Sequence, residues 1–152
     1  MEERNRRASR LLVIDGQQRV LLVQYEDERG EWWATPGGGA EEGESFEEAA
    51  AREAREELGL SAGSIEPLWC GFNEFVSRGI RYRQTEQFFL IRANERDVVI
   101  GSEVQKARTT EGIIASRWWS LDELRATNRL VFPEDLAERI DNMTRDSRTT
   151  PA

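Results

Sequence analysis

The chain of 152 residues has 29 acidic and 21 basic side chains, a net charge of −8, a single cysteine and no histidine. This length suits one domain with its own hydrophobic core, and the negative charge argues against binding of polymeric nucleic acid, which needs a basic surface. The absence of histidine excludes the usual zinc sites and any Ser-His-Asp triad, and one cysteine excludes an internal disulfide.

The N-terminal part of the chain predicts three short strands. Residues 1–7 are polar and basic, and we expect a frayed, flexible lead-in there. Two apolar runs, 10–15 and 19–25, lie on either side of an Asp-Gly turn and predict a hairpin. Residues 32–39 predict a third strand, which ends in consecutive glycines. Its two tryptophans either pack in the core or form an aromatic wall beside the site, and for Trp33 we favour packing that positions the glycine loop.

The next stretch predicts a helix that begins after Ser45 and stops at Gly59. Ser45, with a glutamate three residues later, forms the pattern of a capping box, and Gly59 is a typical C-terminal stop. At about 100° per residue, one broad inward arc carries small and apolar side chains. These are Phe46, Ala49, Ala50, Ala54 and Leu58. Glu53 and Glu57 fall inside the same arc, and Glu56 lies on its flank.

The inward arc and its flank therefore place three carboxylates, those of Glu53, Glu56 and Glu57, where loss of water disfavours their charged form. Desolvation of an unpaired carboxylate costs several kcal/mol or forces its protonation, and three such groups within one turn, roughly 6 Å, repel one another. A divalent cation that prefers oxygen ligands, Mg²⁺ or Mn²⁺, resolves both problems. A solvated acidic face is the alternative, and we accept it for Glu42, Glu47 and Glu48.

Several positions of this region follow a known spacing. They are Gly38, Glu44, Arg52, Glu53, Ala54, Glu56, Glu57, Gly59 and Leu60. These residues fit the Nudix box, G-x5-E-x7-R-E-U-x-E-E-x-G-U with U apolar, so the chain resembles the Nudix (MutT-type) hydrolases. The resemblance implies an α/β fold, the α/β/α sandwich with a mixed β-sheet of that family, in a single domain over residues 1–152. It also implies metal-dependent hydrolysis of a nucleoside diphosphate linked to another group.

Beyond the box, the pattern predicts two long strands, a loop, and a strand followed by a short helix. The long strands cover residues 64–77 and 81–93. The polar connection 94–112 is interpreted as a functional loop over the site, because it is long for a structureless connection. A strand at 117–119 leads into the short helix, which Ser120 caps.

The C-terminal segment has two interpretations. Pro133 predicts the first position of a last helix that runs to about residue 145, followed by a flexible tail over 146–152. Alternatively, Phe132 stacks on a purine base while Glu134 or Asp135 accepts hydrogen bonds from exocyclic amines, as a weak resemblance to mammalian MutT homologues implies. The helix start is the simpler account, and we prefer it.

The resemblance implies a catalytic metal site with more than one Mg²⁺ or Mn²⁺ ion when substrate is bound. Its expected ligands are Glu53, Glu56, Glu57 and the backbone carbonyl of Gly38. The general base is either a box glutamate or an acid of the later loop. There Glu111 ranks above Glu103, because a late ligand of MutT-type members often comes from about this distance before the strand at 117–119. Glu111 is then also a late metal ligand. Its alternative interpretation is a solvated loop acid.

Arginine supplies nearly all of the positive charge, and we expect two roles for it. Arg52 is expected to organise the metal ligands rather than to bind substrate, because Glu48 and Glu56 each lie one turn away. Glu44 either completes the ligand set or anchors the loop. Other guanidinium groups are candidates for phosphate binding, since their planar fork matches phosphate oxygens. These are Arg10, Arg81, Arg83 and Arg117.

Two subgroups of the family carry a marker residue beyond the box. ADP-sugar pyrophosphatases have a proline about sixteen residues after it, and dinucleoside polyphosphate hydrolases have a tyrosine about seventeen residues after it. Counted from Leu60, these positions hold Val76 and Ser77, so neither marker is present. A nucleoside or deoxynucleoside triphosphate is then the leading substrate, with ADP-ribose or another nucleotide sugar as the alternative. A non-catalytic nucleotide-sensing domain is the alternative of another class, and the complete set of box glutamates argues against it.

We expect a cytoplasmic protein that acts on small nucleotides and not at a membrane. No run of 18 apolar residues is present, and no apolar segment follows the basic N-terminus, so the sequence predicts neither a membrane span nor a signal peptide. Cys70 suits a reducing compartment. The sequence does not determine the oligomeric state, although small proteins of the family often form homodimers.

Overall fold

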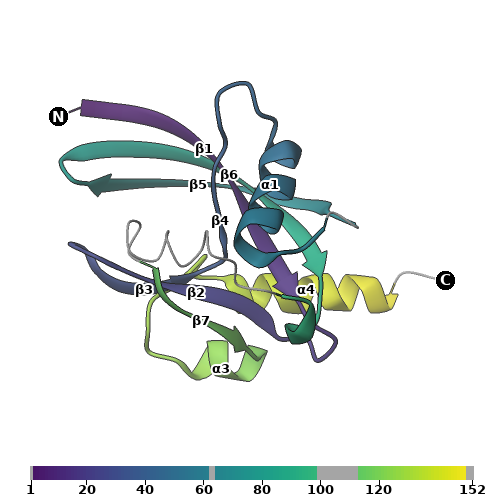
Figure 1. Cartoon of the computed structure of the whole chain (residues 1–152). Coiled ribbons are helices and arrows are strands. Elements are labelled where there is room, and N and C mark those ends of the chain that lie inside the picture. The colour runs from purple at the N-terminus through teal and green to yellow at the C-terminus, as the bar shows by residue number, and fades with distance from the viewer. Residues whose placement is uncertain (1, 62–63, 99–112, 150–152) are drawn as a thin grey trace.

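The computed structural model describes residues 2–61, 64–98 and 113–149, except for the side chains of residues 113–114 and 146–149. Its strands are Glu2–Ile14 (β1), Val20–Asp27 (β2), Gly30–Ala34 (β3), Gly37–Gly39 (β4), Glu66–Ser77 (β5), Ile80–Arg92 (β6), Ile113–Trp119 (β7) and Val131–Phe132 (β8). Its helices are Phe46–Leu58 (α1), the 3-10 turn Glu95–Asp97 (η1), Leu121–Ala126 (α3) and Leu136–Thr149 (α4) (Figure 1). No helix among the described residues is long and apolar enough to cross a lipid bilayer.

Strand β1 organises the sheet that these described strands form. It runs parallel to β6 over its whole length, from the pair Glu2–Ile80 to the pair Ile14–Arg92. On its other edge it pairs antiparallel with β4 through residues 8–10 and with β2 at its end. The strand order is β5-β6-β1-β2-β3-β8, with β4 on β1 and β7 on β2. The mixed sheet that the family resemblance implies is thus confirmed.

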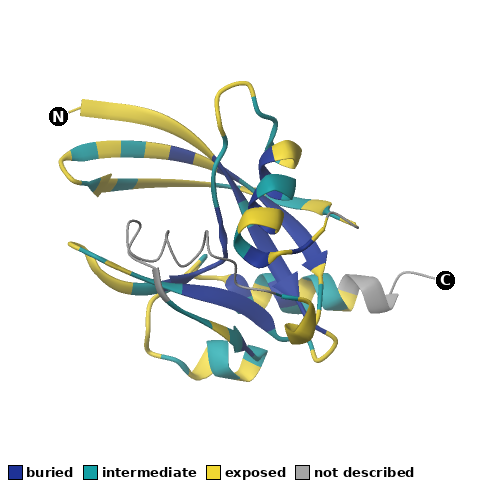
Figure 2. Ribbon diagram, viewed as in Figure 1, coloured by how far each residue is buried: buried dark blue, intermediate teal, exposed yellow. Residues whose placement is uncertain are grey.

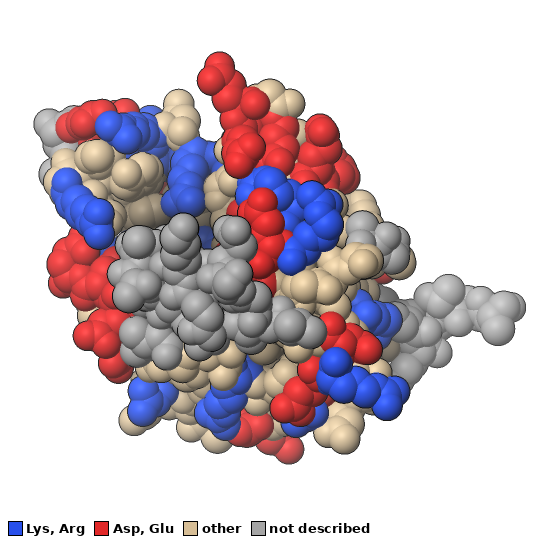
Figure 3. Space-filling model, in the orientation of Figure 1, with Lys and Arg blue, Asp and Glu red and all other residues tan. Residues whose placement is uncertain are grey.

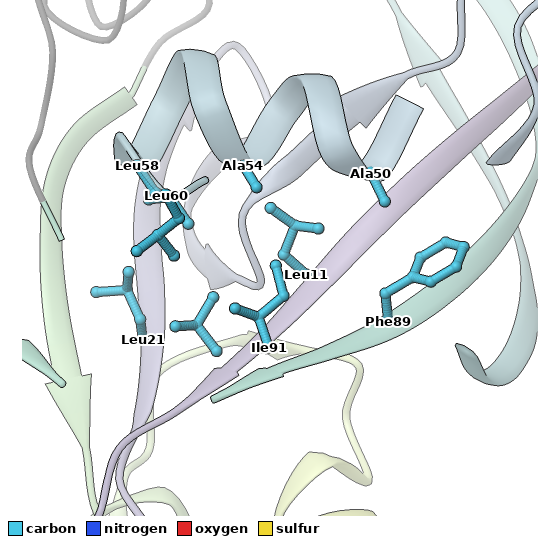
Figure 4. Packing of buried hydrophobic residues seen from close by; sticks show 9 residues of the cluster. Leu11, Leu21, Ala50, Ala54, Leu58, Leu60, Phe89 and Ile91 are labelled. Atoms are coloured by element: carbon cyan, nitrogen blue, oxygen red, sulfur yellow. The ribbon is translucent and has the colours of Figure 1, made fainter. Parts of the chain in front are cut away.

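Helices cover both faces of this sheet where its central strands are apolar. Because alternate residues of a strand face opposite sides, Leu11 and Val13 pack beneath α1, while Leu12 and Ile14 pack against α4. Figure 2 shows the buried segments concentrated where the strands pass beneath α1, and Figure 4 shows the side chains of one half of the core. That half includes Leu11, Leu21, Ala50, Ala54, Leu58, Phe89 and Ile91. The α/β/α sandwich is confirmed.

Helix α1 forms as its sequence predicts. The Ser45 hydroxyl accepts a hydrogen bond from Glu48 N at 3.0 Å, and the Glu48 carboxylate accepts one from Ser45 N at 3.1 Å, which completes the capping box. Gly59 ends the helix with φ 64°, a left-handed conformation that suits glycine. The buried residues of α1 are Ala49, Ala50, Glu53, Ala54 and Leu58, so the inward arc includes a carboxylate.

The structure differs from the sequence-based predictions at both ends of the chain. Residues 2–7, predicted to be a frayed lead-in, belong to β1 because they pair with residues 80–85 of β6. The last helix begins at Leu136 and not at Pro133, because Phe132 is held in β8 by pairing with Ala34 of β3. This helix continues to Thr149, past the predicted end, and residues 150–152 of the expected tail lie outside the described residues.

Candidate active site

A cavity of about 1710 Å³ opens between two hairpins of the sheet. The β2–β3 and β5–β6 hairpins extend to the same side of the fold (Figure 1), and both line this cavity. One side of the cavity is formed by β4 and one face of α1, which bring Arg52, Glu53, Glu56 and Glu57 to it. The box residues therefore share one cavity with aromatic side chains of both hairpins. The aromatic residues include Tyr25, Trp32, Phe75 and Tyr82.

The tips of the two hairpins contact each other at the rim of the cavity. Glu28 Oε1 accepts a hydrogen bond from the backbone N of Arg78 at 3.0 Å. The Arg29 guanidinium lies 4.6 Å from the centre of the Trp32 ring and 4.9 Å from the centre of the Phe75 ring, which are cation–π distances. These contacts join the two walls of the cavity.

The three box glutamates differ in exposure as helix geometry predicts. Glu53 is 8% exposed, Glu57 is half-buried, and the Glu56 side chain is 48% exposed. Burial raises the pKa of Glu53, because removal of water disfavours its charged form. Figure 3 shows further acidic side chains over the β4–α1 loop and the start of α1, with basic side chains beside them. Because Glu53 is the most buried of the three box glutamates, its charged form is the one that a bound cation would stabilise most.

Glycines of β4 allow the glutamates of α1 to lie directly against the strand. A Cβ added at Gly38 would lie 2.7 Å from Glu53 Oε1, which is too close for a side chain. Gly37 has φ +136°, and its backbone N donates to Glu57 Oε2 at 3.3 Å. The side of these two carboxylates that faces β4 therefore meets glycine backbone and no side chain of that strand.

Arg52 connects the acidic residues of the site. Its Nη1 lies 3.1 Å from Glu53 Oε1 and 3.3 Å from Glu56 Oε2, and its Nη2 donates to the carbonyl of Gly39 at 3.1 Å. Its Nε and Nη2 donate to the two carboxylate oxygens of Glu44 at 2.8 and 2.9 Å. Arg52 thus contacts Glu56, which was predicted, and also Glu44, Glu53 and Gly39, which were not.

Glu44 anchors the β4–α1 loop in this arrangement. Besides its two bonds from Arg52, its Oε1 accepts a hydrogen bond from Glu41 N at 2.9 Å. Hydrogen bonds from Arg52 lower the pKa of Glu44 to about 2. Of the two partners predicted for Arg52, Glu56 is present, whereas the Glu48 carboxylate caps the helix instead.

The described residues include no group of three or more acidic or cysteine side chains close enough to hold a metal ion as they stand. Arg52 Nη1 bridges Glu53 and Glu56, so a guanidinium neutralises the pair that we expected to share a cation. The donor atoms nevertheless fit Mg²⁺ or Mn²⁺. Carboxylate oxygens of Glu53 and Glu57 lie against glycine backbone, and hard divalent cations prefer such oxygen ligands.

The structure separates the arginines that were predicted to bind phosphate. Arg10 lines the cavity, where its Nε donates to Glu86 Oε2 at 2.9 Å. Arg81 and Arg83 alternate with the cavity-lining residues of β6, and both are exposed beside acidic side chains at 3.8 Å. Arg117 packs on an indole ring, 4.2 Å from its centre. Arg10 is thus the one of these four that lines the cavity described above.

The remaining predicted residues fall into two groups. Phe132 lines the cavity and is 40% exposed. Glu134 and Asp135 line the same cavity, so the position of this segment agrees with the substrate-binding alternative. Glu103 and Glu111 lie outside the described residues, so the preferred loop base stays a prediction. Trp33 packs edge-on against a core tryptophan at 5.2 Å, which confirms its structural role.

Two polar residues of β6 lie on the floor of the cavity, and of these the sequence analysis missed Gln84. Alternate residues of β6 line the cavity, and among them Gln84 is 1% exposed and Glu86 9% exposed. Glu86 Oε1 also accepts a hydrogen bond from Asn73 Nδ2 at 3.4 Å. The available signal was that Gln84 and Glu86 interrupt the set of alternate residues that otherwise consists of Ile80, Tyr82 and Phe88. For Glu86 the sequence allowed a position facing the site or an exposed edge position equally, and its burial in the cavity lining excludes the exposed edge.

Comparison with known proteins agrees with this geometry. The sequence profile of the NUDIX domain matches residues 4–144. An RNA pyrophosphohydrolase of Sphingopyxis alaskensis is 31% identical, over 76% of this chain and 75% of its own length. The nucleoside triphosphatase NudI of an Enterobacter species is 34% identical, over 61% of this chain and 73% of its own. Among solved structures, a MutT NUDIX hydrolase from Burkholderia pseudomallei has a TM-score of 0.66 and 20% identity, covering 88% of this chain and 95% of that one.

These matches confirm three expectations from the sequence. The solved structure has the same fold, and the profile extends over the strands and helices that build the cavity. The named relatives are a pyrophosphohydrolase and a triphosphatase, which confirms the expected class of enzyme, a hydrolase of phosphoric anhydride bonds. The chain belongs to the Nudix family of hydrolases.

Proposed function

We propose that the protein is a pyrophosphohydrolase of nucleoside or deoxynucleoside triphosphates. The observation that supports this substrate class is one continuous cavity, with the box glutamates on the side that α1 forms and aromatic rings along both hairpins. Cations held by carboxylates attract a polyphosphate, whereas aromatic rings provide a surface on which a base can stack. A relative named as a nucleoside triphosphatase supports the same class.

Glu53, Glu56 and Glu57, with the carbonyl of Gly38, would hold Mg²⁺ or Mn²⁺, and more than one ion when substrate is bound. Such ions neutralise phosphate charge and lower the pKa of water, so neither histidine nor a covalent nucleophile is required.

The rest of the site orients these groups. Arg52 holds Glu53 and Glu56 in position and fixes the preceding loop through Glu44. Arg10 brings a guanidinium to the same cavity, where phosphate oxygens are expected. Glu111 remains the proposed general base of the later loop, and loss of turnover in Glu111→Gln at unchanged stability is the result expected of that role.

The proposed partners are small nucleotides, and the proposed compartment is the cytoplasm, which keeps the single cysteine reduced. One relative is named as an RNA pyrophosphohydrolase, so RNA bearing a 5′-triphosphate is the substrate against which free nucleotides must be compared. A homodimer is the proposed assembly, and light scattering of the purified protein tests it.

A substrate panel tests the proposed function. It contains nucleoside and deoxynucleoside triphosphates, ADP-ribose, dinucleoside polyphosphates and 5′-triphosphorylated RNA, each with Mg²⁺, with Mn²⁺ or with chelator. We expect the highest kcat/KM for a free triphosphate, release of pyrophosphate and a monophosphate, and no turnover with chelator. Preference for ADP-ribose would favour the nucleotide-sugar alternative. Absence of any cleavage, with a nucleotide-dependent rise in melting temperature, would favour a sensing domain.

A further inference from the structure

Gln84 is a buried polar side chain on the floor of the cavity. It is 1% exposed, and neither Oε1 nor Nε2 has a hydrogen-bond partner among the described residues. An amide left unpaired in a protein interior costs about 1–3 kcal/mol, and native structures satisfy the large majority of such groups. Because Gln84 also lines the cavity, a ligand in the cavity can complete its hydrogen bonds.

The residues around Gln84 are held by contacts of their own. Glu86, two positions further along β6, accepts hydrogen bonds from Arg10 at 2.9 Å and from Asn73 at 3.4 Å. Tyr82, two positions earlier, stacks on an aromatic ring of β5 with ring centres 5.1 Å apart. The amide of Gln84 therefore lies between an ion pair and an aromatic stack, both of which are fixed by neighbouring strands.

The sheet sets the separation between Gln84 and the box. Gly38, beside which Glu53 lies, is on β4, which pairs with β1, and β1 pairs with β6. Two strand spacings, roughly 10 Å, separate the glycine strand from the strand of Gln84. Gly38 pairs with Ser9 and Gln84 with Arg6, so an offset of three residues along the strands adds roughly another 10 Å. A nucleoside with its chain of phosphates extends over a distance of this order. A nucleotide with its phosphates at α1 can thus place its base over β6.

We propose that Gln84 recognises the nucleobase of the substrate and determines base preference. A glutamine amide places a donor and an acceptor side by side, which matches adjacent acceptor and donor groups on a base edge. Tyr82, which is half-buried and lines the cavity from the same face of β6, offers ring surface to the base. This inference rests on the proposed function, and it assigns base recognition to β6 instead of to Phe132.

The variant Gln84→Met tests this role, because methionine keeps the length of the side chain and removes both hydrogen-bonding groups. We expect kcat/KM for the preferred triphosphate to fall by about 10- to 100-fold, with smaller changes for the others, so that base preference is lost. The melting temperature of the ligand-free protein should not fall, because the unpaired amide is gone. Gln24→Met is the matched control, since Gln24 is a half-buried strand glutamine outside the cavity lining.

Binding measurements separate this inference from the proposed function. Calorimetry with Mg²⁺ and α,β-methylene analogues of the four nucleoside triphosphates reports base preference without turnover. If the wild type binds one base selectively and Gln84→Met removes this selectivity, the inference is supported. If no triphosphate is hydrolysed in the same experiments, the proposed function is wrong while the inference stands. Hydrolysis with a base preference that Gln84→Met leaves unchanged, particularly if Phe132→Leu removes it, overturns the inference and leaves the function intact. Absence of binding to every analogue overturns the inference as well.

Discussion

Arg52 and Glu44 form a two-point ion pair, in which Nε and Nη2 of the arginine lie 2.8 and 2.9 Å from the two carboxylate oxygens. Paired forks of this kind are among the stronger charged hydrogen bonds in proteins. The same guanidinium lies 3.1 Å from Glu53 and 3.3 Å from Glu56. The position of the β4–α1 loop and the arrangement of the box glutamates therefore depend on one side chain.

This pair predicts a specific acid dependence of stability. Arg52 holds the pKa of Glu44 at about 2, below its ordinary value of 4.5, so the folded state binds this proton less tightly than the unfolded chain. The stabilisation is therefore present above about pH 4.5 and is lost as the pH falls towards 2. We expect the free energy of unfolding to fall more steeply through this window in the wild type than in Glu44→Gln. Urea denaturation at a series of pH values measures both slopes, and equal slopes would contradict the assigned ion pair.

Glu57→Gln tests the metal site directly. Glutamine keeps the shape of the side chain and an oxygen that can accept from Gly37 N, so we expect little change in melting temperature. Turnover with saturating Mg²⁺ should fall by more than about 100-fold, because a charged ligand is lost. Glu47→Gln, at an exposed position of the same helix, should retain wild-type kinetics. Wild-type turnover in Glu57→Gln would remove Glu57 from the ligand set.

Glu53→Gln should remove the response to metal without lowering the stability of the metal-free protein. Burial makes the charged form of Glu53 costly, as its raised pKa indicates, so a neutral amide should not lower the melting temperature of the metal-free protein. In the wild type, Mg²⁺ or Mn²⁺ with nucleotide should raise the melting temperature, because a ligand of the native state stabilises it. That rise should disappear in Glu53→Gln. A full response to the ion in this variant would be inconsistent with ligation by Glu53.

Gly38→Ala should weaken the metal site through Glu53. The new methyl group would lie 2.7 Å from Glu53 Oε1, so the carboxylate must move. We expect the Mg²⁺ concentration for half-maximal activity to rise by about 10- to 100-fold, as when a group that orients a ligand is removed. Gly16→Ala is the control, because its Cβ would lie 3.4 Å from Asn94 Oδ1, and the Mg²⁺ dependence should be unchanged there. An unaltered dependence in Gly38→Ala would show that Glu53 has room to adjust.

The box helix was predictable because its determinants are local. The cap at Ser45, the stop at Gly59 and the order of exposure of the glutamates all follow from spacing within a few turns. Arg52 was predictable only in part. Its contact with Glu56 follows from a spacing of one helical turn, whereas its contact with Glu44 depends on the path of the preceding loop.

Features that depend on distant pairing were not predictable. Residues 2–7 are all exposed, so no hydrophobic alternation marks them as a strand, and their extended conformation comes from β6. The helix signal at Pro133 was misleading because pairing between β8 and β3 extends the chain up to Phe132. Gln84 was missed for a related reason. Its lack of a partner becomes visible only when neighbouring strands are in place.

The parallel pairing of β1 with β6 also affects how the protein is made. Glu2 lies opposite Ile80, and the last pair of the ladder requires Arg92, so the two strands leave the ribosome far apart in time. Pairing over such a distance along the chain is slow, because a long loop must close first. The part of the cavity that β6 lines therefore cannot form until β6 has left the ribosome. Until then, the first strand is an open edge that a chaperone or a second nascent chain can bind.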